Sequence, residues 1–291
     1  MFFTLENKNL KVSLSTFAGG IESIFNKETG NEHFWHYDSA VWPRRTPICF
    51  PICGGLTDGE YTYQGKTYTL PMHGFLREKE LTIIEQTGTK AVMEFVSNEE
   101  TKAVYPFDFK FTLTEELSED SFIIRYMVEN TGSGDMYYSV GSHYTYNLPI
   151  VAGETQNDYR YAFGASQNAG KLMMDGGAIT GKTEDIFHGG NSFDLDGFFE
   201  NGSTILEMSD IDPKFIALES KKTGAFTKVT FDNFSYSVLW APKGISPFAC
   251  IEFWTGMLDQ VRHDKDITKK LGITKLAKGA SSTCTQTITI K

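Results

Sequence analysis

The sequence has few positive charges and no long apolar run. It contains 27 lysines and arginines against 37 aspartates and glutamates, for a net charge of −10. This excess of acidic residues argues against nucleic acids and anionic membranes as partners. No run of about 18 apolar residues is present, so no membrane-spanning helix is expected. Because residues 1–12 also lack the basic head and apolar region of a signal peptide, we expect a cytoplasmic protein.

Cysteine is also scarce, and its spacing fits neither a zinc site nor a redox motif. Three residues separate Cys49 from Cys53, whereas the common motifs have two. Cys250 and Cys284 lie among apolar or strand-like residues, as the first two do. We therefore expect four buried or partly buried free thiols that behave as small apolar side chains.

No motif for a metal or a nucleotide cofactor is evident. His33 and His36 have the spacing of a helical metal site, but Phe34 and Trp35 between them favour a strand, and no acidic residue completes a ligand set. Phosphate-binding loops, dinucleotide-binding glycine motifs and the nucleophile elbow of serine hydrolases are all missing. The sequence therefore predicts no metal and no cofactor.

Apolar residues instead recur at every second position, and helical patterns are scarce. Side chains of a strand point alternately to its two faces, so this period predicts half-buried strands. Short helical turns are expected only at 196–202 and 266–272, and residues 148–195 are expected to form long loops over the binding face. The alternating segments are 61–70, 109–117, 122–130, 234–242 and 282–291.

No linker or internal repeat divides the chain. The alternating segments and frequent turn signals therefore predict an all-β protein with few short helices. We expect residues 1–291 to form one domain, a large antiparallel β-sandwich.

Glu252 lies in an apolar segment, between Ile251 and the aromatic residues Phe253 and Trp254. Such surroundings desolvate a carboxyl group and raise its pKa toward the range of a general base. A structural role would need a buried cation, because buried glutamates are rarely unpaired, and the nearest arginine is Arg262. The segment therefore indicates a catalytic carboxylate.

His143 is the best candidate for an acid partner. It follows Gly141 and Ser142 and precedes Tyr144 and Tyr146. Aromatic rings stack on the apolar faces of sugars, while histidine reaches their hydroxyl groups. The alternative is a structural histidine that hydrogen-bonds to the tyrosine hydroxyls.

Further ligand-binding candidates lie between residues 42 and 78. Arg44 and Arg45 open a proline-rich, extended segment, either as donors to ligand hydroxyls or anions or as a solvated pair. His73 stands beside Gly74, which allows a ligand to approach the backbone, and Arg77 follows. A histidine in such an apolar setting can equally be a satisfied core residue.

Taken in order, three segments resemble the aldose 1-epimerase (galactose mutarotase) family, and specifically its LacX-like branch. They cover residues 44–78, with RRTPICFPICGGLTDG and PMHGFLRE, residues 140–149, with VGSHYTYNLP, and residues 239–259, with ACIEFWTGMLD. The end of the chain from residue 271 also fits, so the resemblance extends over nearly the full chain. It implies a β-supersandwich that interconverts aldose anomers without a cofactor.

The resemblance also implies roles for individual residues. Glu252 matches the general base that takes the proton from the C1 hydroxyl, and His143 matches the general acid that protonates the ring oxygen. This assignment requires an ionised Glu252 and a protonated His143. His73 matches a second histidine that hydrogen-bonds the sugar, and Trp254 belongs to the motif of the base and is expected to contact the sugar. The substrate is then a small sugar, and we expect a monomer or homodimer.

The chain departs from the family pattern at some positions. The family commonly has an arginine where this chain has Gly55, and Arg45 and Arg77 are candidates to take its place. The sugar-binding aspartate has no secure match; Asp194 and Asp196 are candidates by loop position. The arginines leave a hexose-6-phosphate 1-epimerase as an alternative, against the acidic net charge. Because the family arginine is missing, a second alternative is a sugar-binding or sensing protein without catalytic activity.

Overall fold

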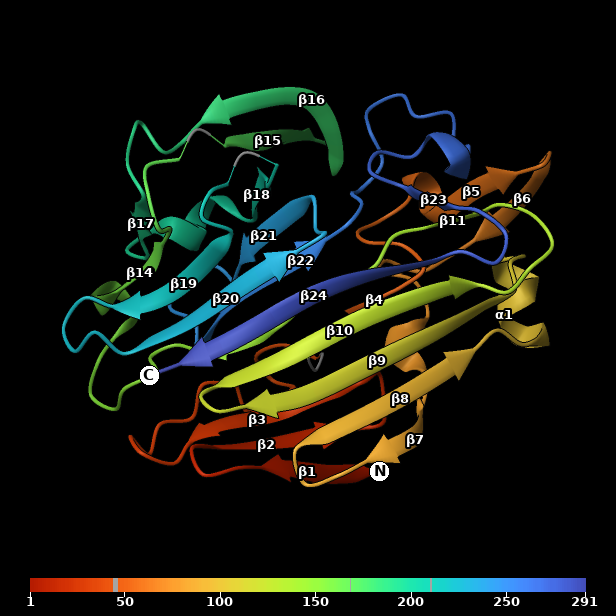
Figure 1. Ribbon diagram of the computed structural model, residues 1–291. Helices are drawn as coiled ribbons and strands as arrows, with labels where there is room; N and C mark the ends of the chain where they lie inside the picture. The colour runs from red at the N-terminus through yellow and green to blue at the C-terminus, as the bar shows by residue number, and fades with distance from the viewer. Residues whose placement is uncertain (44–46, 168, 210) are drawn as a thin grey trace.

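The structure is a computed structural model that describes residues 1–43, 47–167, 169–209 and 211–291. Arg44 and Arg45 thus lie outside the described residues. Two large antiparallel sheets contain most of the strands (Figure 1). The first has nine strands, in the spatial order β17 (Ser192–Asp194), β14 (Tyr159–Ala162), β19 (Phe215–Ser220), β20 (Phe226–Asp232), β24 (Ser281–Ile290), β10 (Ser121–Asn130), β9 (Phe109–Ser118), β8 (Lys90–Val96) and β7 (Thr82–Gln86).

The second large sheet carries the segments that resemble the epimerase motifs. Its strands follow the order β16 (Ala178–Asp185), β15 (Gly170–Asp175), β18 (Thr204–Glu207), β21 (Tyr236–Trp240), β22 (Phe248–Trp254), β12 (Gly141–Ser142) and β4 (Ile48–Cys49), and β13 (Thr145–Asn147) also pairs with β22. The predicted antiparallel all-β fold is therefore confirmed.

Smaller elements complete the architecture. A three-stranded sheet joins β1 (Phe2–Glu6), β2 (Leu10–Ser15) and β3 (Gly20–Asn26), and two pairs join β5 (Glu60–Tyr63) with β6 (Lys66–Thr69) and β11 (Met136–Tyr138) with β23 (Thr274–Leu276). The helices are α1 (Glu99–Val104), η1 (Thr57–Gly59), η2 (Leu76–Glu78), η3 (Gln156–Asp158), η4 (Phe198–Asn201) and η5 (Ile267–Lys269). None of the helices in the described part of the chain is long and apolar enough to cross a membrane.

The two large sheets pack against each other through alternating side chains. Phe253 of β22 stacks on Phe231 of β20, with ring centroids 4.7 Å apart, and the Tyr161 hydroxyl of β14 donates a hydrogen bond to the Cys250 carbonyl. Every residue of β22 is buried. Because alternate side chains point to opposite faces, β22 sends Ile251 and Phe253 into the core and leaves Glu252 facing away from it.

Several local predictions hold, and one is wrong. The hairpin predicted from 109–117 and 122–130 is β9 and β10, and the expected helical turns are η4 and η5. Residues 148–195, predicted as loops, contain the four strands β14 to β17. Their alternation is weak because β15 and β16 form a largely exposed hairpin at the sheet edge, where apolar residues are not required.

His33 and His36 form no joint site. The His33 side chain is fully buried, and its Nδ1 lies 2.8 Å from the Thr227 hydroxyl, whereas His36 is exposed and lies 3.7 Å from Glu32. Burial lowers the pKa of His33 to about 4. In the unfolded chain a histidine titrates near pH 6.5. As the pH falls, the unfolded chain therefore takes up this proton at a higher pH than the folded protein does.

This shift predicts a pH dependence of stability. Between pH 6.5 and 4 the unfolded state binds more protons than the folded state, so stability falls as pH falls. The His33 contribution amounts to about 3 kcal/mol over this window. In His33→Gln, which lacks the titrating group, denaturant unfolding at several pH values should show a correspondingly smaller decline than in the wild type. The exposed control His36→Gln should keep the wild-type decline; an unchanged decline in His33→Gln would contradict the assignment.

Candidate active site

A cavity of about 580 Å³ opens on the eight-stranded sheet. Its size is typical of small-molecule sites, and its wall is mainly apolar with a few polar side chains. The polar and charged residues of the wall are His73, Arg77, His143, Ser203 and Glu252, and the others are Trp42, Pro47, Gly54, Met72, Met174, Gly177, Ile205, Val238, Trp240, Trp254 and Leu258.

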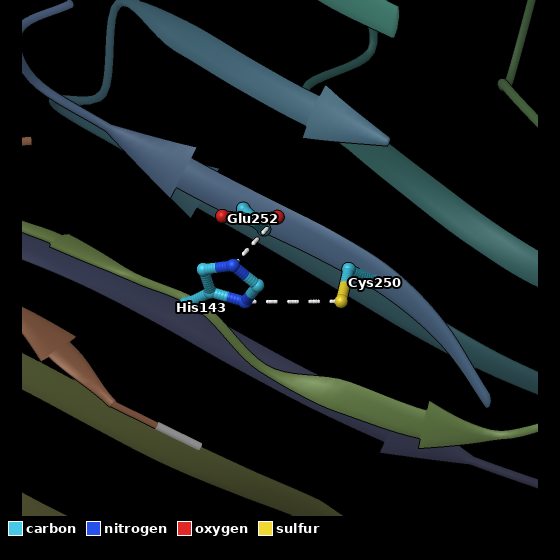
Figure 2. A group of neighbouring side chains, drawn as sticks. All are labelled: His143, Cys250 and Glu252. Atoms are coloured by element: carbon cyan, nitrogen blue, oxygen red, sulfur yellow. Dashed lines mark hydrogen bonds and ion pairs between the residues drawn. The ribbon is translucent and has the colours of Figure 1, made fainter. Parts of the chain in front are cut away.

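The register of the sheet places His143 opposite Glu252. β12 pairs Ser142 with Phe253, and β13 pairs Thr145 with Cys250, so the residues between them continue the same antiparallel register. His143 Nε2 lies 3.5 Å from Glu252 Oε1 (Figure 2). The histidine is 8% exposed and the glutamate 1%. The two residues selected from the sequence therefore meet in the cavity wall, as a directly opposed pair on neighbouring strands.

Burial sets the protonation of this pair. It raises the pKa of Glu252 well above its usual range, with a further contribution from Cys53, and it lowers the pKa of His143 to about 3, helped by the charge of Arg77. Both shifts favour a protonated carboxyl beside a neutral imidazole. This is the opposite of the ionised glutamate and protonated histidine expected from the sequence, because that expectation ignored the loss of solvation of His143.

His73 is held by its backbone and by one ring nitrogen. Its N–H donates to the Gly54 carbonyl at 2.8 Å, and the Gly54 N–H donates to His73 Nδ1 at 3.1 Å. Since Nδ1 accepts a hydrogen bond, the neutral ring carries its proton on Nε2 and acts as a donor there. The adjacent Gly74 has φ +70°, and a Cβ at Gly74 would lie 2.3 Å from the Phe50 carbonyl oxygen, so the close packing of this loop requires glycine.

Tryptophans surround the two histidines. Trp42 stacks on His143 with ring centroids 4.8 Å apart, Trp240 meets the same imidazole edge to face, and Trp254 packs against His73. Of these, only Trp254 was predicted to line the site. Trp240 could have been found, because it shares a face of β21 with Val238, whereas nothing local to Trp42 indicates its contact with His143.

Tyr144 and Tyr146 do not face the cavity, contrary to the expectation that they stack on a ligand. Both are fully buried in the core, and the Tyr144 hydroxyl hydrogen-bonds to the Tyr126 hydroxyl at 2.6 Å rather than to His143. Strand alternation explains the error, since neighbours of His143 in an extended chain point to the opposite face.

Arg77 lies in the cavity wall with its side chain 12% exposed and its Nε 3.9 Å from Glu78. The predicted substitution of the family arginine by Arg77 is therefore geometrically possible. Gly55 itself has room for a side chain, because within the described part of the chain a Cβ there would meet only the Met72 methyl group, at 3.7 Å.

Asp194 is not part of this cavity, which corrects its prediction as a sugar ligand. It lies on β17, at the edge of the nine-stranded sheet, with its side chain 61% exposed and 3.1 Å from Lys221. The prediction failed because loop position does not reveal which sheet a short strand joins.

All four cysteines are free and buried, as predicted. Two of them contact the cavity histidines: Cys49 Sγ lies 3.2 Å from His73 Nδ1, and Cys250 Sγ lies 3.8 Å from His143 Nδ1. Within the described ranges, one group of His, Cys, Asp and Glu side chains has ligand atoms close enough together to hold a metal ion, namely His143, Cys250 and Glu252.

Comparisons with known proteins identify the family of the chain. The chain is 28% identical to the chromosomal protein LacX of Lactococcus lactis subsp. lactis, over 100% of this chain and 99% of that one. It is similar to a galactose mutarotase related enzyme from Lactobacillus acidophilus (27% identity, TM-score 0.94, covering 100% and 97% of the two chains) and to a galactose mutarotase-like protein from Lactobacillus casei (25%, 0.93, 100% of both). The family model for aldose 1-epimerase matches residues 1–261. The chain therefore belongs to the aldose 1-epimerase family.

Proposed function

We propose that the protein is an aldose 1-epimerase that interconverts the α and β anomers of a free hexose. The observation that carries this proposal is the pair of His143 and Glu252, 3.5 Å apart in the wall of a cavity of small-molecule size. Anomer exchange requires one group that removes the proton of the C1 hydroxyl and one that protonates the ring oxygen. These two oxygens are bonded to the same carbon, so two adjacent acid–base groups reach both.

The pair carries out the exchange without a change in its total charge. Glu252 takes the C1 hydroxyl proton, and His143 gives a proton to the ring oxygen. The ring opens to an aldehyde, the bond between C1 and C2 rotates, and closure on the other face returns both protons. Because burial favours the neutral pair in the empty cavity, the bound sugar has to stabilise the ion-pair arrangement. Its hydroxyls can do so by donating to Glu252 Oε2, which is buried and makes no hydrogen bond to any of the described residues.

Other residues of the wall would orient the sugar. His73, fixed in its tautomer by Gly54, would donate to a hydroxyl, and Arg77 would supply a charged donor. The rings of Trp240 and Trp254 would cover apolar faces of the pyranose. Exclusion of water by these side chains strengthens the electrostatic interactions of the acid–base pair.

The first test replaces the base. Glu252→Gln keeps the size of the side chain but cannot accept the proton, so its rate of anomer exchange should fall by about 10²–10⁴-fold. Polarimetry or NMR exchange on freshly dissolved α-anomers of several hexoses measures this rate. Glu207→Gln, which changes an exposed glutamate on β18 of the same sheet, serves as the matched control and should retain the rate.

Two outcomes would contradict the proposal. Full activity in Glu252→Gln would remove Glu252 as the base. Calorimetric binding of a sugar by the wild type without acceleration of anomer exchange would instead indicate a binding or sensing protein.

A second test concerns the sugar contacts. Arg77→Leu should raise KM for free hexoses by about 10–100-fold, because a hydrogen bond to a charged group contributes about 1.5–3 kcal/mol. Asp194→Asn should leave KM unchanged, since this carboxylate lies outside the cavity and pairs with Lys221. Steady-state kinetics should include a hexose 6-phosphate as substrate. If the wild type markedly prefers this phosphate and Arg77→Leu loses the preference, the result would support a hexose-6-phosphate 1-epimerase instead.

A third test restores the family arginine. Gly55→Arg should fold with nearly wild-type stability because the position is open, and the added guanidinium beside Met72 should lower KM for free hexoses. Gly54→Arg is the matched control: its φ of +72° and the contact of a Cβ with Leu258 at 2.7 Å should destabilise the protein by more than 1 kcal/mol. Thermal unfolding and steady-state kinetics distinguish the two variants. A large loss of stability in Gly55→Arg would show that the surroundings of Gly55 have no room for the arginine side chain.

A further inference from the structure

Cys250 brings a third metal-ligand type to the acid–base pair. It lies two residues before Glu252 on β22, so both side chains point to the same face of the strand. The imidazole of His143 faces both side chains (Figure 2). Its Nε2 lies 3.5 Å from Glu252 Oε1, and its Nδ1 lies 3.8 Å from Cys250 Sγ. One ligand atom from each residue lies within 4.8 Å of the other two. All three residues are at least nine-tenths buried.

We propose that His143, Cys250 and Glu252 form a binding site for a thiophilic divalent cation such as Zn²⁺, and that occupancy of this site excludes the sugar. Nitrogen, sulfur and carboxylate oxygen are the ligand types that zinc takes in proteins. Bonds of about 2.0–2.3 Å in a tetrahedral arrangement keep ligand atoms roughly 3–4 Å apart. The separations, which reach up to 4.8 Å when one ligand atom is taken from each residue, thus need to close by at most about 1 Å. Rotation of the Cys250 and His143 side chains would do this and would turn one ring nitrogen toward the ion.

A second observation points to a ligand at this position. Glu252 Oε2 is buried and has no hydrogen-bond partner among residues 1–43, 47–167, 169–209 and 211–291, which is a costly state for a carboxyl oxygen in an apolar wall. A cation would satisfy it, and the cavity lined by His143 and Glu252 gives the ion a path from solvent. The open side of a three-ligand site would hold water or another small ligand, as in zinc sites that are not closed by a fourth side chain.

Binding would be coupled to proton release. The Cys250 thiol, and Glu252 where it is protonated, lose their protons to solvent as they bond to the ion, while the neutral imidazole binds through a lone pair. The ion would then occupy both groups that are proposed to act on the sugar. Sugar and cation should therefore compete, so that the site makes the enzyme sensitive to free zinc.

Calorimetric titration of the metal-free full chain with Zn²⁺ tests the site directly. We expect one ion per chain, with affinity reduced at least tenfold in Cys250→Ser and in His143→Gln. Cys284→Ser is the matched control, because this thiol is buried elsewhere, with Sγ 3.2 Å from the Asn233 carbonyl, and its loss should not change the affinity. Titration with Cd²⁺ should produce a thiolate-to-metal absorption band in the wild type and in Cys284→Ser, and this band should be lost in Cys250→Ser.

Three results would overturn the proposal: no saturable zinc binding by the folded wild type, unchanged affinity in Cys250→Ser, or loss of binding in Cys53→Ser instead. Circular dichroism shows whether each variant is folded, and Cys250→Ala replaces Cys250→Ser if the serine variant is not. Because these measurements record binding rather than turnover, they remain valid if anomer exchange is absent. Weakened zinc affinity at saturating sugar would support the predicted competition, whereas unchanged affinity would contradict it.

Discussion

The structure of the site depends on one contact, that between His143 Nε2 and Glu252 Oε1. A carboxyl group and an imidazole can act together on two oxygens bonded to one carbon only when they lie side by side. The sheet provides this geometry through a single antiparallel register that pairs Ser142 with Phe253 and Thr145 with Cys250. A shift of one residue would turn either side chain into the core, so the register of these strands determines whether the site exists.

The surrounding structure keeps this contact dry and rigid. β22 is buried along its whole length, between the core on one face and the cavity wall on the other. Trp42 and Trp240 cover the imidazole, and the loop at His73 is tied to Phe50 and Gly54 by backbone hydrogen bonds. Apolar packing thus explains why both pKa values shift toward the neutral pair. The register of β13 and β22 likewise places Cys250, to which the proposed mechanism gives no role, against His143.

The sequence predicts those features that depend on local pattern. The period of two identifies β9 and β10, and the apolar setting of Glu252 identifies a buried carboxyl group. Features that depend on long-range pairing could not be predicted in this way. Asp194 was selected from a loop that proved to be an edge strand of the other sheet, and Trp42 reaches His143 across about a hundred residues. Tyr144 is a different case: local alternation sends it to the core, so its burial could have been predicted from the sequence. The protonation of His143 was also mispredicted, because its desolvation arises from side chains distant in sequence.

A crystal structure with a bound hexose would test the central claim most directly. The account predicts a pyranose in the cavity, with its ring oxygen within hydrogen-bonding distance of His143 and its C1 hydroxyl beside Glu252. A sugar bound with C1 turned away from this pair, or bound outside the cavity, would contradict it.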